Sequence, residues 1–530
     1  MRARLRRNLG HAQQMRRMAA RTAARPVARV VAVSGSVLRS ADRLMPGRLL
    51  QMLRSSCNSA SRRAFRAMWH RAGAWRPLLS AEPDQLSVGP LTRRLTLQAF
   101  LALPDAPYRR CFARFDKRLE WISKRAECRA GFSGGVLMMI GTLGPGGAER
   151  QLVATARALR AGEKLDVDVA VACVSLAAPA QRFFQADLEA AHIDVALIGA
   201  EPEIAMPDEL RELLRTLPSE LHEVRQYATT LWARRPQIAH LWLDEINTKG
   251  GLAAVLTGVP KIIVSQRSLP PTNFIFHQPH MRETYRWLAR RPNVFMINNS
   301  EAGARAYEAW LGLPGGTIGV VRNGYAFSDS EIASHQAARG RYREQTGIPA
   351  GAPVVGAVMR FSEEKQPQLW LEIAAHVRAV LPDAHFLIVG DGPLRKSLEK
   401  RALQPDLAGS VHFVGHLKDA LDAIVDMDLL LLTSRVEGLP NVLVEAQFLG
   451  VPVAATPVGG APEALDHGRS GWLLDGGAPL ANAERIVALL KNTEWRKAAA
   501  EHGPRFVRER FSMRRAIDET LALYGDAINR

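Results

Sequence analysis

Short apolar runs alternate with segments of helical periodicity from about residue 134 onward. The first run, 135–143, leads into a glycine-rich turn, and apolar positions in the following segment, 148–161, recur at helical spacing. Continuous runs of Val, Ile and Leu indicate strands that are buried on both faces. Because such strands alternate with helices, the pattern predicts a parallel sheet with helices on either side.

A polar stretch at 326–350 divides the apolar runs into two sets. The first set predicts strands at 135–143, 167–176, 194–198, 238–243, 261–265, 294–298 and 318–321. The second predicts strands at 354–359, 385–389, 411–414, 429–432, 451–455 and 471–474, with helices that include 368–380, 395–402 and 442–449. We therefore predict two doubly wound, Rossmann-like α/β domains, 133–335 and 336–511, each long enough for its own core. Ligands of such sheets bind beyond the carboxyl ends of the strands, so two facing domains would share one cleft.

The first 132 residues have no comparable strand pattern. Helical segments are expected at 62–69 and 109–125, with prolines between them, so we predict a basic extension that is partly helical and partly disordered. It holds 28 Lys and Arg against 7 Asp and Glu, a balance of +21, while the other residues hold 42 against 45, a balance of −3. The net charge of +18 therefore belongs to the extension, and an anionic partner is indicated for that region alone.

The composition of the 530 residues, 47% hydrophobic and 23% charged, excludes a wholly disordered, collagen-like or coiled-coil chain. Four cysteines without CxxC spacing exclude a disulfide framework, argue against a zinc site and fit a reducing compartment. No apolar run reaches the roughly 18 residues of a membrane-spanning helix. The candidate signal segment 26–38 contains Arg29, so we expect neither a transmembrane helix nor a signal peptide.

The turn after the first predicted strand is rich in glycine. Gly144, Gly146 and Gly147 precede a helix, and backbone amides at a helix N-terminus suit an anion that approaches closely where side chains are missing. Glu149 stands where the dinucleotide fingerprint requires a small residue, and no GxxxxGK[ST] segment occurs in the chain. The turn therefore matches neither of those nucleotide motifs, and an anion site and a tight turn without a ligand are the alternatives.

Two glutamates lie on either side of a predicted helix start in the second domain. Glu437 belongs to the loop after strand 429–432, and Glu445 lies in the early turns of a helix that begins at Pro440 or Asn441. Amides at that helix start could bind sugar hydroxyls or phosphate, and Glu445 could accept two ribose hydroxyls. The alternative is that Glu445 only complements the helix dipole while Glu437 is solvated.

Two basic residues follow the first strand of the second domain. Arg360 comes directly after strand 354–359, and Lys365 follows in the same loop. From the carboxyl end of a strand both could reach a diphosphate, Arg as a bidentate partner and Lys as a point charge. A charged surface loop with no ligand is the alternative.

Taken together, these segments resemble the retaining GT-B-fold glycosyltransferases of glycosyltransferase family four (group 1). The resemblance covers about residues 135–527, and its most specific part is the ordered set of Arg360, Lys365, Glu437 and Glu445. The segments that carry it are TLGPGGAERQ (142–151), PQIAHLWLD (236–244), VVRNG (320–324), MRFSEEKQ (359–366), LIVGDGPLRKSL (387–398), VEGLPNVLVEAQFLGVPVAAT (436–456), GGAPEAL (459–465) and RERFS…TLALY (508–524).

The resemblance implies roles for the matching positions. Arg360 and Lys365 would neutralise the leaving diphosphate of a nucleotide sugar in place of a metal, so neither a metal nor a cofactor is expected. Glu437 would hold the sugar and support the transition state, and Glu445 would bind the nucleotide ribose. The C-terminal helix, 512–530, would pack back on the first domain. Further donor contacts would come from Gly438, Leu439, Pro440 and Asn441 on one domain and from Gly146 and Gly147 on the other.

Some positions depart from the family pattern. Arg322 replaces the common proline before Asn-Gly, and Arg267 occupies the region where many members have a histidine. Arg267, which could bind a phosphate, and His240 are acceptor-side candidates; for His240 a core histidine is the alternative. The segment 426–428, Asp-Met-Asp, looks like a DxD metal motif but precedes a strand, so we expect no metal there.

We therefore expect a retaining, hexosyltransferase-like enzyme that moves a sugar from a nucleotide-sugar donor to a glycan or lipid-linked acceptor in cell-surface polysaccharide or glycolipid synthesis. The alternatives are another GT-B activity, such as a nucleotide-sugar epimerase or an inverting transferase, and a non-catalytic membrane-binding module. For residues 1–132 the alternatives are a membrane-surface arm, a disordered tail and a wrongly chosen start. No nucleic-acid partner is expected, because no aromatic-interleaved platform accompanies the charge. The expected location is the cytoplasm, peripheral to the inner face of the cell membrane.

Overall fold

The computed structural model describes Phe112, Phe132 and residues 134–162, 168–201, 206–273, 277–417, 419–475 and 478–525. The expected helices at 62–69 and 109–125 lie outside the described residues, apart from Phe112. The described residues of 134–273 and 280–525 belong to one compact unit, which contains both sheets. No helix among them has both the length and the hydropathy needed to cross a membrane.

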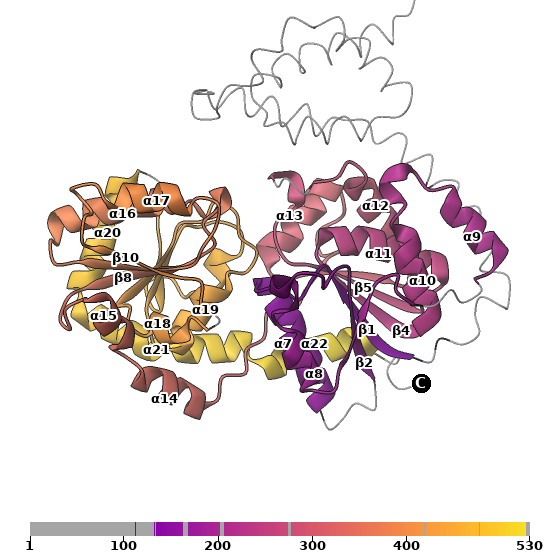
Figure 1. The fold of residues 1–530 in the computed structure, drawn as a ribbon, viewed down its shortest axis with the longest axis horizontal. Coiled ribbons are helices and arrows are strands. Elements are labelled where there is room, and N and C mark those ends of the chain that lie inside the picture. Colours follow the sequence, from indigo (N-terminus) through magenta and orange to yellow (C-terminus); the bar gives the residue numbers. More distant parts are fainter. Residues whose placement is uncertain are drawn as a thin grey trace, which may run out of the picture. The chain divides into compact units, whose positions relative to one another are not determined.

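The first domain is built on a parallel sheet with the order β3-β2-β1-β4-β5-β6-β7. Figure 1 shows this sheet with β1, β2, β4 and β5 labelled. Its strands are β1 (Gly134–Ile140), β2 (Val169–Cys173), β3 (Asp194–Leu197), β4 (Pro236–Trp242), β5 (Lys261–Gln266), β6 (Val294–Asn298) and β7 (Gly319–Val320). Its helices are α7 (Gly147–Ala161), α8 (Gln185–Glu189), α9 (Asp208–Arg215), α10 (Val224–Arg234), α11 (Asp244–Thr257), α12 (Met281–Leu288) and α13 (Glu301–Leu311).

The second domain has a parallel sheet with the order β10-β9-β8-β11-β12-β13. Its strands are β8 (Val354–Val358), β9 (His385–Val389), β10 (Val411–Gly415), β11 (Leu429–Leu432), β12 (Val453–Ala455) and β13 (Gly471–Leu473). The helices from here to the C-terminus are α14 (Asp329–Ala337), α15 (Arg341–Thr346), α16 (Pro367–Val380), α17 (Arg395–Ala402), α18 (Leu421–Ile424), α19 (Asn441–Phe448), α20 (Pro479–Lys491), α21 (Thr493–Phe511) and α22 (Met513–Tyr524). Both sheets confirm the predicted doubly wound fold, and their order reverses between β1 and β4 and between β8 and β11, where such folds bind ligands.

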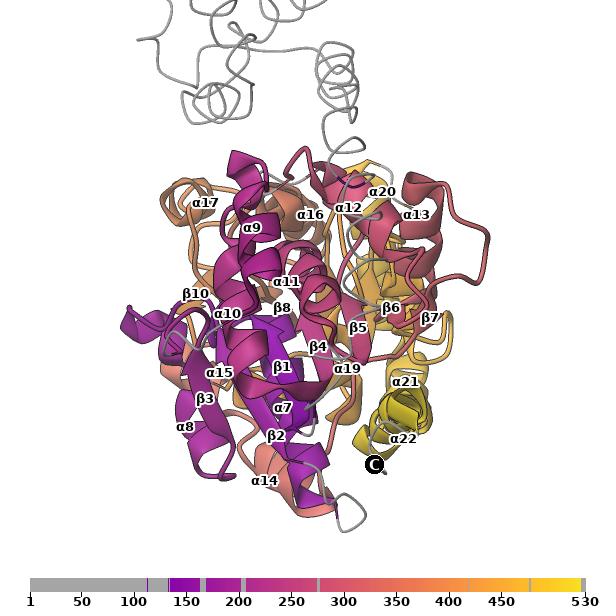
Figure 2. The same ribbon diagram turned by 90° about the vertical axis from the view of Figure 1, so that its right-hand side faces the viewer.

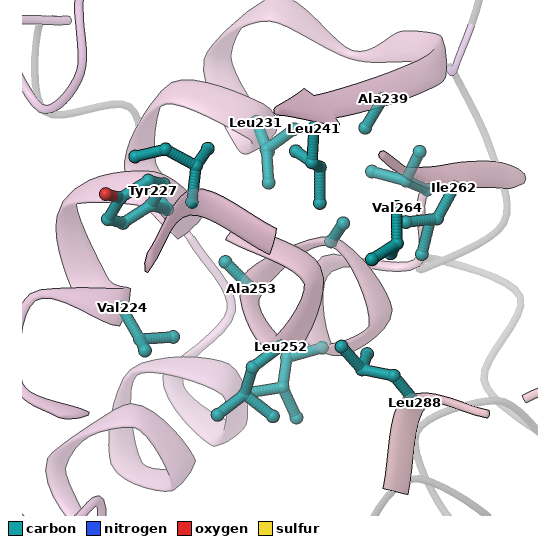
Figure 3. Packing of buried hydrophobic residues seen from close by; sticks show 14 of the residues in the cluster. Val224, Tyr227, Leu231, Ala239, Leu241, Leu252, Ala253, Ile262, Val264 and Leu288 are labelled. Atoms are coloured by element: carbon teal, nitrogen blue, oxygen red, sulfur yellow. The ribbon is translucent and has the colours of Figure 1, made fainter. Parts of the chain in front are cut away.

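Helices cover both faces of the first sheet. Because successive residues of a strand point to opposite faces, each strand contributes buried side chains to both layers. On β4, Ala239 and Leu241 face α10, α11 and α12, while Ile238 and Trp242 face the layer of α7, α8 and α22. Figure 3 shows the first of these layers, where Leu241 and the β5 residues Ile262 and Val264 pack among helical side chains. Burying one such side chain contributes about 1.5–3 kcal/mol, which explains why the runs are apolar on both faces.

The two C-terminal helices, yellow in Figure 2, contribute to different cores. Val507 and Phe511 of α21 are buried in the core of the second domain. Tyr524 of α22 is buried in the first domain, with Ile517 and Leu521 packed nearby. The chain therefore crosses back, and α22 covers the same sheet face as α7.

Candidate active site

The two basic residues that were predicted to bind a diphosphate, Arg360 and Lys365, lie beyond the carboxyl end of β8. Arg360 is exposed, and no described residue pairs with its guanidinium. Lys365 ends a short 3₁₀ helix (Glu363–Lys365), and its Nζ lies 2.6 Å from Oε1 of Glu437, which follows the neighbouring strand β11. Glu437 has a side chain only 8% exposed. The structure thus brings the predicted cation and carboxylate together, because adjacent parallel strands end at the same edge.

The start of α19 contacts the first domain. Pro440 is its N-cap and makes no side-chain capping bond. The Asn441 side chain instead accepts from Asn323 Nδ2 (2.5 Å) and Tyr325 Oη (2.7 Å) and donates to the carbonyl of Gly147 (3.3 Å). Two predicted donor-binding segments from different domains are therefore in direct contact, and the first amides of α19 stay without a side-chain cap.

Glycine is required on both sides of this contact. A Cβ at Gly438 would lie 2.4 Å from the carbonyl oxygen of Arg267, and one at Gly147 would lie 2.8 Å from Asn441 Nδ2. Gly146 is the N-cap of α7, again with no side-chain capping bond. Leu439, by contrast, is buried in the core of the second domain and anchors the loop. Gly438 thus permits an approach of two backbones that a side chain would prevent, while Gly147 leaves room for the Asn441 side chain.

Glu445 is almost wholly buried and forms an ion pair with Arg150 of α7. Nη1 of Arg150 lies 2.6 Å from Oε1 of Glu445. Burial raises the pKa of the Glu445 carboxyl, and the charge of Arg150 lowers it in part. The pair therefore links the helix after the glycine turn to the helix after the Glu437 loop.

Arg267, an acceptor-side candidate, follows β5. Its guanidinium carbon lies 4.1 Å from the centroid of the Trp242 ring, and its Nη atoms donate to Ser265 Oγ (3.3 Å) and Asn323 Oδ1 (2.6 Å). Burial lowers the pKa of Arg267 to about 9. Since Asn323 also contacts Asn441, Arg267 is connected to the start of α19 through one side chain.

His240, the other acceptor-side candidate, is buried within the first domain. Its Nδ1 lies 2.8 Å from the hydroxyl of Tyr524 in α22. Burial, followed by the charge of Arg267, lowers the pKa of His240 to about 3, so the ring is neutral at physiological pH. This environment favours the core-histidine interpretation.

The Asp426–Asp428 segment is occupied by structural contacts. Asp426 accepts from the amides of Tyr342 (2.7 Å) and Arg343 (3.1 Å), and Asp428 pairs with the Arg343 guanidinium (2.9 Å). These contacts attach α15 to the start of β11. Within the described ranges, no group of three His, Cys, Asp or Glu side chains is arranged to hold a metal ion.

Sequence reasoning missed several residues of this region: Arg150, Asn323, Tyr325 and Glu463. For Arg150 a signal was available, because a cation in the first turn of a helix opposes the helix dipole and calls for a nearby anion. The other three make contacts between residues far apart in the sequence, for which no local pattern exists.

Comparison with known proteins supports the fold and gives the family. Residues 338–506 match the family model described as glycosyl transferases group 1. The Vi polysaccharide biosynthesis protein VipC/TviE of Salmonella typhi is 32% identical over 413 residues, which cover 73% of this chain and 71% of that protein. The 2-deoxystreptamine glucosyltransferase of Streptomyces kanamyceticus is 28% identical over 290 residues, 53% of this chain and 74% of that one.

A solved structure shares the fold. Alr3699/HepE from Anabaena, crystallised with UDP and glucose, superposes with a TM-score of 0.59 at 23% identity, covering 73% of this chain and 98% of that one. The fold and these matches together define a glycosyltransferase of the two-domain GT-B class. The chain belongs to the group 1 glycosyltransferase family.

Proposed function

We propose that this glycosyltransferase moves a sugar from a nucleotide-sugar donor to a glycan or lipid-linked acceptor, with retention of the anomeric configuration. The observation that carries the proposal is the set of charged side chains at the carboxyl edge of the second sheet, where Arg360 and Lys365 follow β8 and Glu437 follows β11. The VipC/TviE protein is named for Vi polysaccharide biosynthesis, which supports a role in making cell-surface polysaccharide or glycolipid.

The proposed reaction breaks the bond between the anomeric carbon and the diphosphate oxygen. The bonding electrons leave with the nucleoside diphosphate, and the acceptor oxygen bonds to the anomeric carbon and passes its proton to the departing diphosphate. Arg360 and Lys365 stabilise the departing diphosphate, and fixed charges of this kind need no reorganisation during the reaction. Glu437, held by Lys365, contacts the sugar and supports its positive charge, and the backbone of residues 438–441, in which Pro440 has no N–H, holds the donor together with Gly146 and Gly147.

We further propose that no metal takes part. The two cations supply the charge neutralisation that a divalent ion would give, and the carboxylates of Asp426 and Asp428 are used by backbone amides and by Arg343. Arg267 is proposed to line the acceptor side, where its Nε has no hydrogen-bond partner among the described residues.

The full chain titrated by calorimetry with UDP-, GDP- and ADP-sugars is expected to bind one of these donors. With glycan and lipid-linked acceptors, Glu437→Ala should lower transfer by about 10²–10³-fold while nucleotide binding survives. Arg360→Ala should weaken nucleotide binding itself, whereas the control Arg401→Ala, which removes an exposed pair with Asp406, should change neither. Absence of binding to every donor, or unaltered turnover in both site variants, contradicts the proposal.

For the basic extension, we propose attachment to an anionic membrane surface on the cytoplasmic side. Its balance of +21 supports this, because each basic residue near anionic headgroups contributes about 1 kcal/mol. Full-length protein should bind vesicles that contain phosphatidylserine, and the binding should weaken as salt rises. Deleting residues 1–132 should abolish it; salt-independent binding, or binding that survives the deletion, argues against this role.

A further inference from the structure

The ion pair between Arg150 and Glu445 joins two helices that the sequence separates by 295 residues. Arg150 lies in the first turn of α7, directly after the glycine turn, and its side chain is 44% exposed. The Glu445 side chain is 5% exposed. Its Oε1 accepts from Arg150 at 2.6 Å, and no hydrogen bond from a described residue to its Oε2 accompanies this pair. One carboxylate oxygen is thus paired with Arg150, while the other has no hydrogen-bond donor among the described residues and can accept from a ligand.

The surroundings of Glu445 make its charge dependent on Arg150. Among the described residues, three groups face the carboxylate: Arg150 from α7, Asp419 from the loop after β10, and Tyr325 from the segment before α14. Burial and the charge of Asp419 raise the pKa of Glu445, and Arg150 opposes both. Tyr325 stays neutral, because burial and the nearby Glu445 raise the pKa of its phenol. Of these groups only Arg150 stabilises the ionised carboxylate.

We propose that Arg150 is a positioning residue for donor binding. It keeps Glu445 ionised and fixed through Oε1, so that Oε2 accepts the hydroxyls of the donor ribose. An ionised acceptor makes stronger hydrogen bonds than a neutral one, and a protonated carboxyl would present a donor where the ribose also donates. This inference rests on the proposed function, in which Glu445 binds the ribose; the part assigned to Arg150 is additional.

The consequence is a coupling between the two domains at the donor site. The cation belongs to the first domain and the carboxylate to the second, so Glu445 is prepared for the ribose only while α7 and α19 are in contact. Loss of Arg150 should make ribose recognition depend on pH: the raised pKa of Glu445 leaves its carboxyl protonated at low pH, and the ionised form returns as pH rises.

The test compares the ribose and 2′-deoxyribose forms of UDP, GDP and ADP on the full chain, using whichever diphosphate binds. The wild type is expected to prefer the ribose form by about tenfold at both about pH 6 and about pH 8.5. In Arg150→Met the preference should be smaller than in the wild type, and it should rise as the pH is raised from the lower value to the higher one, because the ionised carboxylate becomes more populated. Arg150→Lys should keep most of it at both.

Arg160→Met is the matched control, because it removes an exposed ion pair with Asp168 from the same helix and should behave as wild type. Thermal unfolding of each variant verifies that it is folded. The proposal is overturned if Arg150→Met keeps the wild-type preference at both pH values, or if it loses affinity equally for both sugar forms, since Arg150 would then contact the diphosphate or act only structurally. If the wild type binds no nucleoside diphosphate, the proposed function itself fails, which is a separate result.

Discussion

At the scale of single residues, a glycine at this site allows the backbones of the two domains to approach closely. The carbonyl of Arg267 in the first domain lies against Gly438 in the second, where a Cβ would be 2.4 Å away. Gly438 immediately follows Glu437, whose carboxylate is held by Lys365 at 2.6 Å. A displacement of the backbone at residue 438 would therefore move the proposed catalytic carboxylate, because the two residues share a peptide unit.

Substitution Gly438→Ala should accordingly destabilise the protein by about 1–3 kcal/mol and lower transfer more than it lowers nucleotide binding. Gly315→Ala is the matched control, since a Cβ there meets nothing within 4 Å and the residue has no positive φ. Chemical denaturation and donor-consumption assays measure the two effects. Equal stability and activity in the two variants would show that the close approach is not required.

Among the helices, α13 depends on a residue from the other domain. The carboxylate of Glu463 accepts from the amides of Glu301 (3.0 Å) and Ala302 (2.8 Å) in the first turn of α13. Arg322 pairs with Glu301 at 2.8 Å and with Glu463 at 3.4 Å. The residue that departs from the family's proline therefore belongs to a charged contact that connects the domains.

Replacing Glu463 by Ala should cost about 0.5–2 kcal/mol of unfolding free energy, since two amides at the helix start lose their acceptor and the helix dipole loses its anion. Glu484→Ala serves for comparison, because Glu484 is exposed in the middle of α20, away from the start of its helix. Thermal unfolding of both variants tests this. Should the two melt at the same temperature as wild type, Glu463 contributes nothing to the stability of α13.

At the scale of the whole molecule, the two C-terminal helices link the two domains. Helix α21 is buried against the second domain and α22 against the first, where the Tyr524 hydroxyl meets Nδ1 of His240. The carbonyl of Tyr524 also accepts from Lys261 at the start of β5 (3.0 Å). A polar pair buried in this way holds α22 in one register on the sheet.

His240 should make global stability depend on pH. Its folded pKa of about 3 lies below the ordinary value of 6.5, so its contribution is fully present above about pH 6.5 and is lost as pH falls toward 3. Between about pH 6.5 and about pH 5 the wild type should lose roughly 2 kcal/mol more than His240→Gln. His376→Gln, at an exposed position of α16, should follow the wild-type profile. Parallel profiles for wild type and His240→Gln would refute this linkage.

Every predicted strand from 134 onward is present, most within two residues of its expected ends. The strands β6, β9 and β11 have the expected bounds, because buried parallel strands are continuous apolar runs whose ends coincide with polar residues or glycine. The positions of Arg360, Lys365, Glu437 and Glu445 beyond strand ends or on helix starts follow from the same local pattern. These features depend on neighbours along the chain, and a sequence contains that information directly.

Which side chains pair across the two domains, by contrast, is decided by the tertiary structure. The cation in the first turn of α7 calls for a nearby anion, but no local pattern shows that this anion lies 295 positions away, or that the Asn441 side chain donates to the carbonyl of Gly147. The assignment of His240 to a buried pair also required the path of α22. Such contacts arise from the order of strands in two sheets and the return of the C-terminal helix. The sequence therefore determined the residue types and their positions on strands and helices. The folded arrangement decided which groups pair, and these pairs set the charge and the position of each group.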